Sequence, residues 1–167
     1  GTGIKQLPDS IGQLVNLEKL SHCRNGLRIL PECIGNLQKL EKLDLTHNLL
    51  TELPESIGQL VNLQELYISG SGYPLTGLIQ LPESFRGLQK LEKLMLNDNL
   101  LTELPKSIVQ LMNLQVLNLR KNQLTKLPEN LFSEGLPNLQ ELRLDDNQLT
   151  ALPENLFSEL RLDDNQL

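Results

Sequence analysis

The chain has 167 residues, enough for one domain with a sizeable buried core, and a formal net charge of −6. Aromatic residues make up 3%, tryptophan is absent and leucine supplies most of the apolar content, which favours one packing unit used many times over a mixed globular core. Acidic and basic residues are interspersed and no apolar run is long enough to span a bilayer, so non-specific nucleic-acid binding and membrane insertion are not expected.

A leucine-proline pair recurs along the whole chain and marks a repeating unit. The spacings are 23, 23, 28, 23, 23 and 25 residues, and the pairs begin at Leu7, Leu30, Leu53, Leu81, Leu104, Leu127 and Leu152. Each unit carries LxxLxLxxNxL followed by xxLPxxIxxL. The pattern predicts one domain of about seven repeats over residues 1–167, in which 1–6 are the tail of a preceding repeat and 152–167 are a truncated last repeat.

The first unit departs from this pattern in the segment LEKLSHCRNGL. His22 stands where later units have a leucine that should point inward. Either His22 takes that inward position, or the unit has lost two residues and Cys23 takes the position of the repeated asparagine. The sequence leaves both interpretations open.

The second unit shows the expected local structure. Leu43 and Leu45 are two residues apart, the period of a strand, so both should point to one face. Leu53 and Ile57 follow at helical spacing, and Pro54 suits the entry to a short helix or 3₁₀ turn. Each unit should therefore be a strand and a returning arc, which makes successive strands parallel and the crossover right-handed.

One polar position recurs where each strand should end. It is occupied by Asn25, Asn48, Ser71, Asn99, Asn122, Asn147 and Asn165. An inward-turned amide can satisfy backbone groups there, so the stacked asparagines should form a ladder. The third unit carries five extra residues within GYPLTGLIQ, which should bulge near Gly72, Tyr73 and Pro74.

The side chains that flank the inward leucines should form one open face. The candidate binding residues on this face are Lys42, Asp44, His47, Glu65, Tyr67, Lys93, Met95, Asp98, Val116, Asn118, Arg120, Lys121, Arg143 and Asp145. Tyr67 and Met95 occupy equivalent positions on adjacent strands, and Val116 lies diagonally beyond Met95. An apolar trio ringed by charge is typical of an interface hot spot, although three unrelated surface residues would give the same pattern.

The segment ELRLDDNQL occurs twice near the C-terminus. Asp145 and Asp146 should stack beside Asp163 and Asp164, and four carboxylates there would attract a cation or a basic partner. The alternative is a solvated surface held in place by Arg143 and Arg161.

The sequence lacks the patterns that enzyme chemistry requires. It has no glycine-rich phosphate loop and no nucleophile paired with a base in a recognisable context. The soft metal ligands do not have the spacing of a zinc motif; they are His22, Cys23, Cys33 and His47. No catalytic residue, metal site or cofactor is therefore predicted.

These units resemble the leucine-rich-repeat superfamily over essentially the whole chain. LPDSIGQLVNL and LPESIGQLVNL are similar to the 23-residue repeats of Ras-signalling scaffold proteins, plant relatives and immune receptors, and bacterial surface or effector proteins. LPENLFSEGLPNLQELRLDDNQLTALP resembles longer extracellular repeats with a phenylalanine on the convex side, matched by Phe132 and Phe157. The resemblance implies an α/β fold: a right-handed horseshoe solenoid with a parallel β-sheet on its concave face and short helices or 3₁₀ turns on its convex face.

The resemblance also implies that the concave face binds another protein. Two cysteines and no Asn-x-Ser/Thr sequon favour an intracellular (cytoplasmic) scaffold or a bacterial effector-type fragment. The phenylalanine-containing repeats favour a secreted or cell-surface domain that binds protein or glycan, and a substrate-selecting domain of a larger enzyme is a further alternative. Neither end shows a cap, so we expect a monomeric fragment that relies on neighbouring segments, or end-to-end association through the termini.

Overall fold

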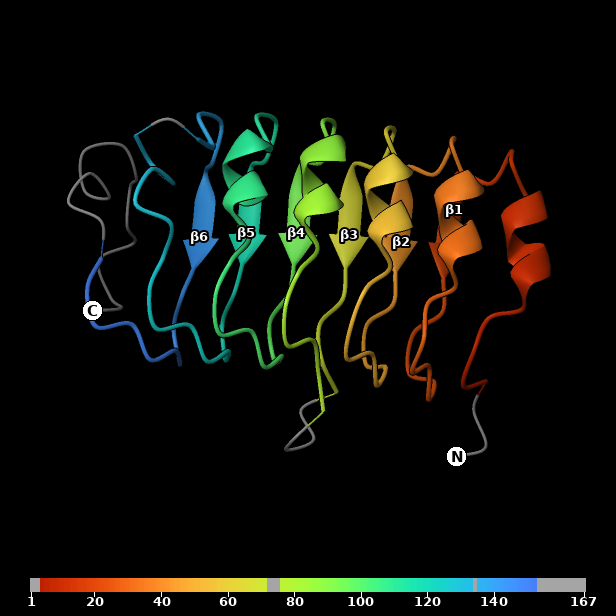
Figure 1. Ribbon diagram of the computed structural model, residues 1–167, viewed down its shortest axis with the longest axis horizontal. Coiled ribbons are helices and arrows are strands. Elements are labelled where there is room, and N and C mark those ends of the chain that lie inside the picture. Colours follow the sequence, from red (N-terminus) through yellow and green to blue (C-terminus); the bar gives the residue numbers. More distant parts are fainter. Residues whose placement is uncertain (1–3, 72–75, 134, 153–167) are drawn as a thin grey trace.

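The computed structural model describes residues 4–71, 76–133 and 135–152. Within these ranges, six short strands follow one another in chain order and form one parallel sheet (Figure 1). They are β1 (Lys19–Ser21), β2 (Lys42–Asp44), β3 (Glu65–Tyr67), β4 (Lys93–Met95), β5 (Val116–Asn118) and β6 (Glu141–Arg143). The predicted strand of the seventh unit lies outside the described residues.

In the described part of the chain, five 3₁₀ helices alternate with the strands and stack along the other side of the solenoid (Figure 1). They are η1 (Asp9–Gln13), η2 (Glu32–Asn36), η3 (Glu55–Gln59), η4 (Glu83–Gly87) and η5 (Lys106–Gln110). A proline in extended conformation precedes each helix, as at Pro54 with φ −67° and ψ 150°. Proline suits this place because its missing N–H would have no partner in the first turn. In the sixth unit, residues 129–133 form turns instead of a 3₁₀ helix.

The core is a continuous column of leucines between the sheet and the helices. Leu43, Leu45 and Ile57 have no exposed surface, as the strand and helical periods predicted. Across the sheet, the direct partners are Leu20, Leu43, Leu66, Leu94, Leu117 and Leu142. Phe132 is also buried in this core, at 7% exposure, while Phe157 lies outside the described residues. Each unit buries its apolar face on its neighbours, so the units are stable only when stacked.

Backbone conformation decides the register of the first unit. The residue before each repeated asparagine has a positive φ, at Arg24 (55°), His47 (57°), Asp98 (59°), Lys121 (53°) and Asp146 (58°). Arg24 therefore corresponds to His47, and no residues have been lost. His22 takes the inward position, and its Nε2 is buried without a hydrogen-bond partner. The alternative that placed Cys23 in the asparagine position is wrong, because Asn25 occupies it.

The repeated asparagines form a ladder at the strand-exit side of the core, buried at three positions and partly buried at the last. We call Asn48, Asn99, Asn122 and Asn147 the asparagine ladder. In Asn122, Oδ1 accepts a hydrogen bond from the N–H of Leu101 at 3.0 Å, and Nδ2 donates to the carbonyl oxygens of Leu96 (3.0 Å) and Leu119 (2.9 Å). The predicted ladder is present at these four asparagines, each of which ties its unit to the one before. Asn165 lies outside the described residues.

The third unit interrupts this ladder. The Ser71 hydroxyl lies 3.4 Å from Thr76 Oγ1 instead of bonding the neighbouring unit in the way that an asparagine does. The expected bulge at Gly72, Tyr73 and Pro74 lies outside the described residues. The chain is back in register at Leu78, whose carbonyl accepts the N–H of Leu100. The insertion therefore leaves the stacking of the following units intact.

Candidate functional site: the concave face of the sheet

The outward side chains of the strands form two rows across the sheet. One row is Lys19, Lys42, Glu65, Lys93, Val116 and Glu141. The other row is Ser21, Asp44, Tyr67, Met95, Asn118 and Arg143. Nine of the fourteen candidate residues lie in these rows. The remaining candidates follow the strand ends; they are His47, Asp98, Arg120, Lys121 and Asp145.

Three apolar side chains meet in the middle of this face. Tyr67 is the direct partner of Met95, and Val116 pairs with Lys93, which places Val116 diagonally from Met95 as predicted. All three are half-buried. Since neighbouring strands lie about 4.8 Å apart, these side chains form one surface, which we call the apolar patch.

Glu65 organises a charged cluster beside the apolar patch. Its carboxylate accepts hydrogen bonds from Lys42 Nζ at 2.7 Å, Tyr67 Oη at 3.1 Å and Lys93 Nζ at 3.3 Å. Lys42 Nζ also lies 4.7 Å from the centre of the Tyr67 ring. The hydrogen bond from Lys42 lowers the pKa of Glu65, and the same bond raises the pKa of Lys42. The Tyr67 ring is thus held in place by its own chain, which reduces the entropy that binding would cost.

Two candidates in the second row also stabilise the turns that follow the strands. Asp44 Oδ1 accepts the N–H of Thr46 at 3.1 Å, and Asn118 Oδ1 accepts the N–H of Arg120 at 3.1 Å. Burial alone would raise the pKa of Asp44, but hydrogen bonds from Cys23 and Thr46 hold that pKa below its usual value. Asn118 is only 5% exposed, so it offers a partner little surface.

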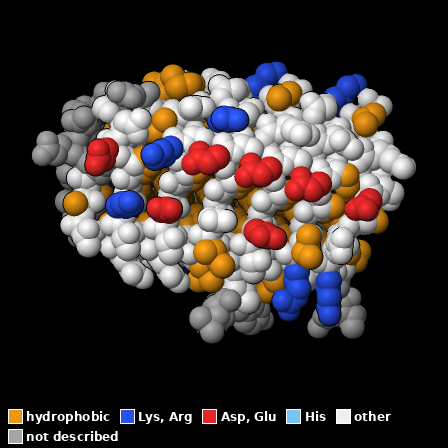
Figure 2. All heavy atoms as spheres, in the orientation of Figure 1, with side chains coloured by type: hydrophobic (Ala, Val, Ile, Leu, Met, Phe, Trp, Pro, Cys, Tyr) orange, Lys and Arg blue, Asp and Glu red, His pale blue; other side chains and the backbone are white. Residues whose placement is uncertain are grey.

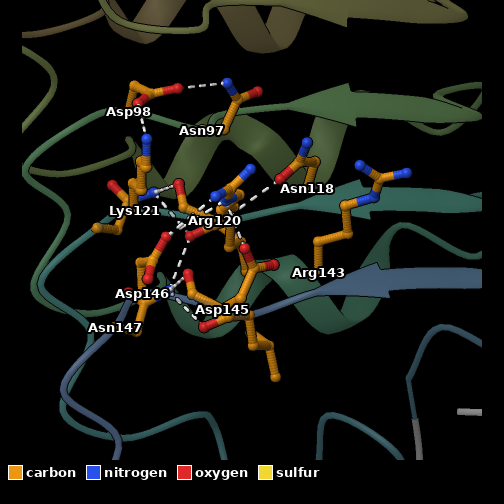
Figure 3. Close-up of polar contacts among 12 residues, drawn as sticks. Asn97, Asp98, Asn118, Arg120, Lys121, Arg143, Asp145, Asp146 and Asn147 are labelled. Carbon is orange, nitrogen blue, oxygen red and sulfur yellow. Dashed lines mark hydrogen bonds and ion pairs between the residues drawn. The ribbon is translucent and has the colours of Figure 1, made fainter. Parts of the chain in front are cut away.

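Ion pairs link the strand ends of the fifth and sixth units (Figure 3). The Arg120 guanidinium pairs with Asp145 and lies 3.3 Å from Asp146. The expected cluster of four carboxylates also involves Asp163 and Asp164, which lie outside the described residues. The expectation that Arg143 holds these aspartates is wrong, because Arg120 of the preceding unit pairs with both of them and Arg143 pairs with Glu141. Arg161, the other arginine of that expectation, lies outside the described residues.

A polar network extends from these ion pairs toward the middle of the face (Figure 3). Lys121 Nζ lies 3.8 Å from Asp98 Oδ1, and Asn97 Nδ2 donates to Asp98 Oδ2 at 2.7 Å. Ser69 Oγ in turn donates to Asn97 Oδ1 at 2.7 Å. Asn97 holds the same place after its strand as Arg120 does.

His47 and Arg143 lie toward opposite ends of the face. His47 Nδ1 is 3.0 Å from the carbonyl oxygen of Gly70 on the next unit. Arg143 pairs with Glu141 on its own strand. Both side chains are exposed, so both remain accessible to a partner.

The opposite surface carries a row of carboxylates (Figure 2). Acidic residues begin four of the 3₁₀ helices, at Asp9, Glu32, Glu55 and Glu83. Glu32 accepts the N–H of Ser56 at 3.3 Å, and Glu83 accepts the N–H of Ser107 at 3.1 Å. Glu32 and Glu83 thus each join their unit to the next one, a structural role that needs no ligand.

The described residues contain no group of three or more histidine, cysteine or acidic side chains arranged to hold a metal. Among the same residues, no helix has the length and apolar character needed to cross a bilayer. Cys23 and Cys33 are both free thiols. Burial raises the pKa of the Cys23 thiol, which disfavours the reactive thiolate.

Comparisons with known proteins agree with this geometry. A family model described as a leucine-rich repeat region matches residues 6–99, and a leucine rich repeat model matches residues 81–124 and 112–167. No curated protein sequence matches the chain significantly.

Among solved structures, a leucine-rich-repeat protein of Leptospira interrogans is 39% identical to this chain and has a TM-score of 0.81. The match covers 89% of this chain and 36% of that one. The leucine-rich repeat domain of the type III effector XopL is 33% identical with a TM-score of 0.77, over 90% of this chain and 51% of that one. The chain thus spans about a third of the first of these structures and about half of the second.

Proposed function

This chain belongs to the leucine-rich-repeat family, and we propose that it is a non-enzymatic module that binds another protein on its concave face. The observation that carries the proposal is the apolar patch of Tyr67, Met95 and Val116 at the centre of the open sheet. Protein interfaces commonly combine an apolar centre with a polar rim, and a few central aromatic or apolar residues supply most of the binding energy.

The charges around the patch support a protein partner over a polyanion. Glu65 is shared by Lys42 and Lys93, and Arg120 faces two aspartates, so much of the positive charge on this face is already neutralised. A nucleic-acid surface needs unneutralised lysine and arginine side chains that can reach phosphates. A protein partner can instead cover the apolar patch and exchange hydrogen bonds with the rim.

For the setting, we favour an intracellular scaffold or a bacterial effector-type module. The two free cysteines support this choice, and two similar structures come from a Leptospira protein and a type III effector. A surface domain that binds protein or glycan is the second candidate, favoured by the buried Phe132 of the late repeat. The third is the substrate-selecting part of a larger enzyme, since both similar structures extend well beyond the region that this chain matches.

The test is affinity capture from a cell extract, with partners quantified by mass spectrometry. The binding variant is Tyr67→Ala/Met95→Ala/Arg120→Ala. The control variant, Val61→Ala/Met112→Ala/Arg86→Ala, removes comparable exposed side chains outside the strands. Thermal unfolding of both variants checks that the solenoid stays folded.

We expect at least one partner to be retained by the control variant and reduced tenfold or more by the binding variant, because the latter removes the central anchor residues. Equal capture by both folded variants would contradict the concave-face assignment.

A further inference from the structure

The asparagine ladder lacks one rung, between the second and third units. In a complete rung, one asparagine makes three hydrogen bonds to backbone groups. Asn99 accepts the N–H of Leu78 at 2.9 Å and donates to the carbonyl oxygens of Ile68 (2.8 Å) and Leu96 (2.9 Å). Asn48 and Asn147 repeat this pattern. The third unit has Ser71 at this place, and its hydroxyl faces Thr76 instead.

The missing rung leaves a specific backbone donor open. Leu50 stands two residues after Asn48, as Leu101 stands two residues after Asn99. The N–H of Leu101 bonds to Asn122, whereas the N–H of Leu50 makes no hydrogen bond to another described residue. A buried backbone N–H without a partner is rare, because its desolvation is not compensated.

Two carbonyl oxygens at the same place each accept one hydrogen bond from an asparagine side chain, where their counterparts accept two. In the unbroken part of the ladder, the carbonyls of Leu96 and Leu119 each accept two asparagine amides. Among the described residues, the carbonyl of Leu45 accepts only Asn48, and the carbonyl of Ile68 accepts only Asn99. One donor and two acceptor positions are therefore open, the same three that an asparagine would fill.

A small cavity lies between these groups. Its volume is about 10 Å³, and its walls include Leu45, Leu50 and Ile68 together with the ladder residues Asn48 and Asn99. Both asparagines are buried, at 4% and 6% exposure. A polar cavity of this size has room for one water molecule and for nothing larger.

We propose that a single buried water molecule binds in this cavity and replaces the missing asparagine side chain. Its oxygen accepts the Leu50 N–H, and its two hydrogens are donated to the carbonyl oxygens of Leu45 and Ile68. A cation would leave the N–H without an acceptor, and an anion would face two carbonyl oxygens. Only a small neutral ligand with two donors and an acceptor matches all three groups.

The water explains how the solenoid tolerates the insertion after β3. Ser71 does not make the hydrogen bonds of a ladder asparagine, and the bound water joins the second and third units in their place. At this position the hydrogen bonds between the second and third units depend on a ligand that can dissociate. At Asn122 and Asn147 the corresponding hydrogen bonds are made by side chains.

The direct test is water–amide NMR on the ¹⁵N-labelled chain. We expect nuclear Overhauser and rotating-frame cross-peaks of opposite sign between water and the Leu50 amide proton, as a long-lived buried water gives. The Leu101 amide is the internal control, because Asn122 occupies the same place there. A peak relayed by the nearby Ser69 hydroxyl would disappear in Ser69→Ala, whereas a peak from bound water persists in that variant.

A second variant replaces residues 70–77 with His-Asn-Leu, the sequence at 47–49, and so restores an asparagine to the rung. We expect the Leu50 water peak to vanish and its amide hydrogen exchange to slow at least tenfold relative to Leu101. Absence of the water peak in the wild-type chain, or its survival in this variant when β4–β6 keep their native amide shifts, would overturn the proposal.

Discussion

Two columns of buried or partly buried polar side chains run along this solenoid, and they are repeated for different reasons. The asparagine ladder lies at the exit ends of the strands, and each of its amides bonds to three backbone groups, as at Asn122. The second column, which we call the serine column, runs through the 3₁₀ helices at Ser56, Ser84 and Ser107. The buried hydroxyls of these serines have no hydrogen-bond partner.

The difference shows that a polar residue can recur at one position of each unit either for its hydrogen bonds or for its small size. In the serine column, the neighbouring unit comes very close: a Cβ added to Gly35 would lie 2.9 Å from the Cβ of Ser56, and one added to Gly58 would lie 2.7 Å from the Cβ of Ser84. A small side chain is needed there for its size, whereas the asparagines are needed for their amide groups. Three substitutions separate these two causes, and a fourth tests the concave face.

The largest effect is expected in the asparagine ladder. Asn122→Ala leaves the Leu101 N–H and one acceptor position on each of two carbonyls open in the core, so it should lower the free energy of unfolding by about 3 kcal/mol. Urea denaturation measures the change. Asn113→Ala is the control, because Asn113 is exposed and makes one bond to Gln89; a similar loss in both variants would refute the special role of the ladder.

The next effect tests close approach at the serine column. In Gly58→Ala, the new Cβ would lie 2.1 Å from the carbonyl oxygen of Ser84, so the two units must move apart, at a cost of about 2 kcal/mol. Gly26→Ala is the matched control, since nothing lies within 4 Å of its added Cβ. The thermal midpoint should fall for the first variant only, and equal midpoints would show that the helices are not tightly packed.

A smaller effect is expected for the polar groups of the concave surface. The hydrogen bond from Lys42 lowers the pKa of Glu65, so this pair stabilises the folded chain above the usual glutamate pKa. The contribution should be lost as the pH falls below about 4, toward the lower folded pKa. Because the Lys42 side chain is 39% exposed, the effect stays below about 1 kcal/mol. Urea melts of the wild type and Glu65→Gln should differ at pH 7 and converge near pH 3; a constant difference would contradict this assignment.

The smallest effect is expected at the serine column itself. Ser56→Ala removes a hydroxyl that has no partner and keeps the backbone N–H that Glu32 accepts. The free energy of unfolding should change by less than about 0.5 kcal/mol, or rise slightly. A loss comparable to that of Asn122→Ala would mean that the serine hydroxyls are hydrogen-bonded after all.

Much of this architecture could be predicted from spacing alone. The two-residue period at Leu43 and Leu45 and the proline before Ile57 were enough to predict the parallel strands and the 3₁₀ arcs. The same register predicted that Tyr67 and Met95 would be neighbours. These predictions succeeded because a solenoid repeats one local structure, so a residue's place in its unit decides which way it points.

Other features of the candidate site depend on contacts that spacing does not describe. Strand alternation placed Asn118 on the open face, but its bond to the Arg120 N–H leaves it almost buried. Alternation also marked Glu65 as exposed, without indicating that two lysines and Tyr67 share its carboxylate. Whether the apolar patch binds a partner remains a prediction for the capture experiment.

The sequence by itself determined the repeat, the order and direction of the strands and the leucine core, because these follow from a period that each unit shares. Only the tertiary structure decided that His22 fills an inward position and that the asparagine ladder breaks at Ser71. The first outcome follows from the backbone conformation at Arg24, and the second from the contact of Ser71 with Thr76. The bonds of the ladder join residues 21 to 31 positions apart, and a single unit does not contain that information.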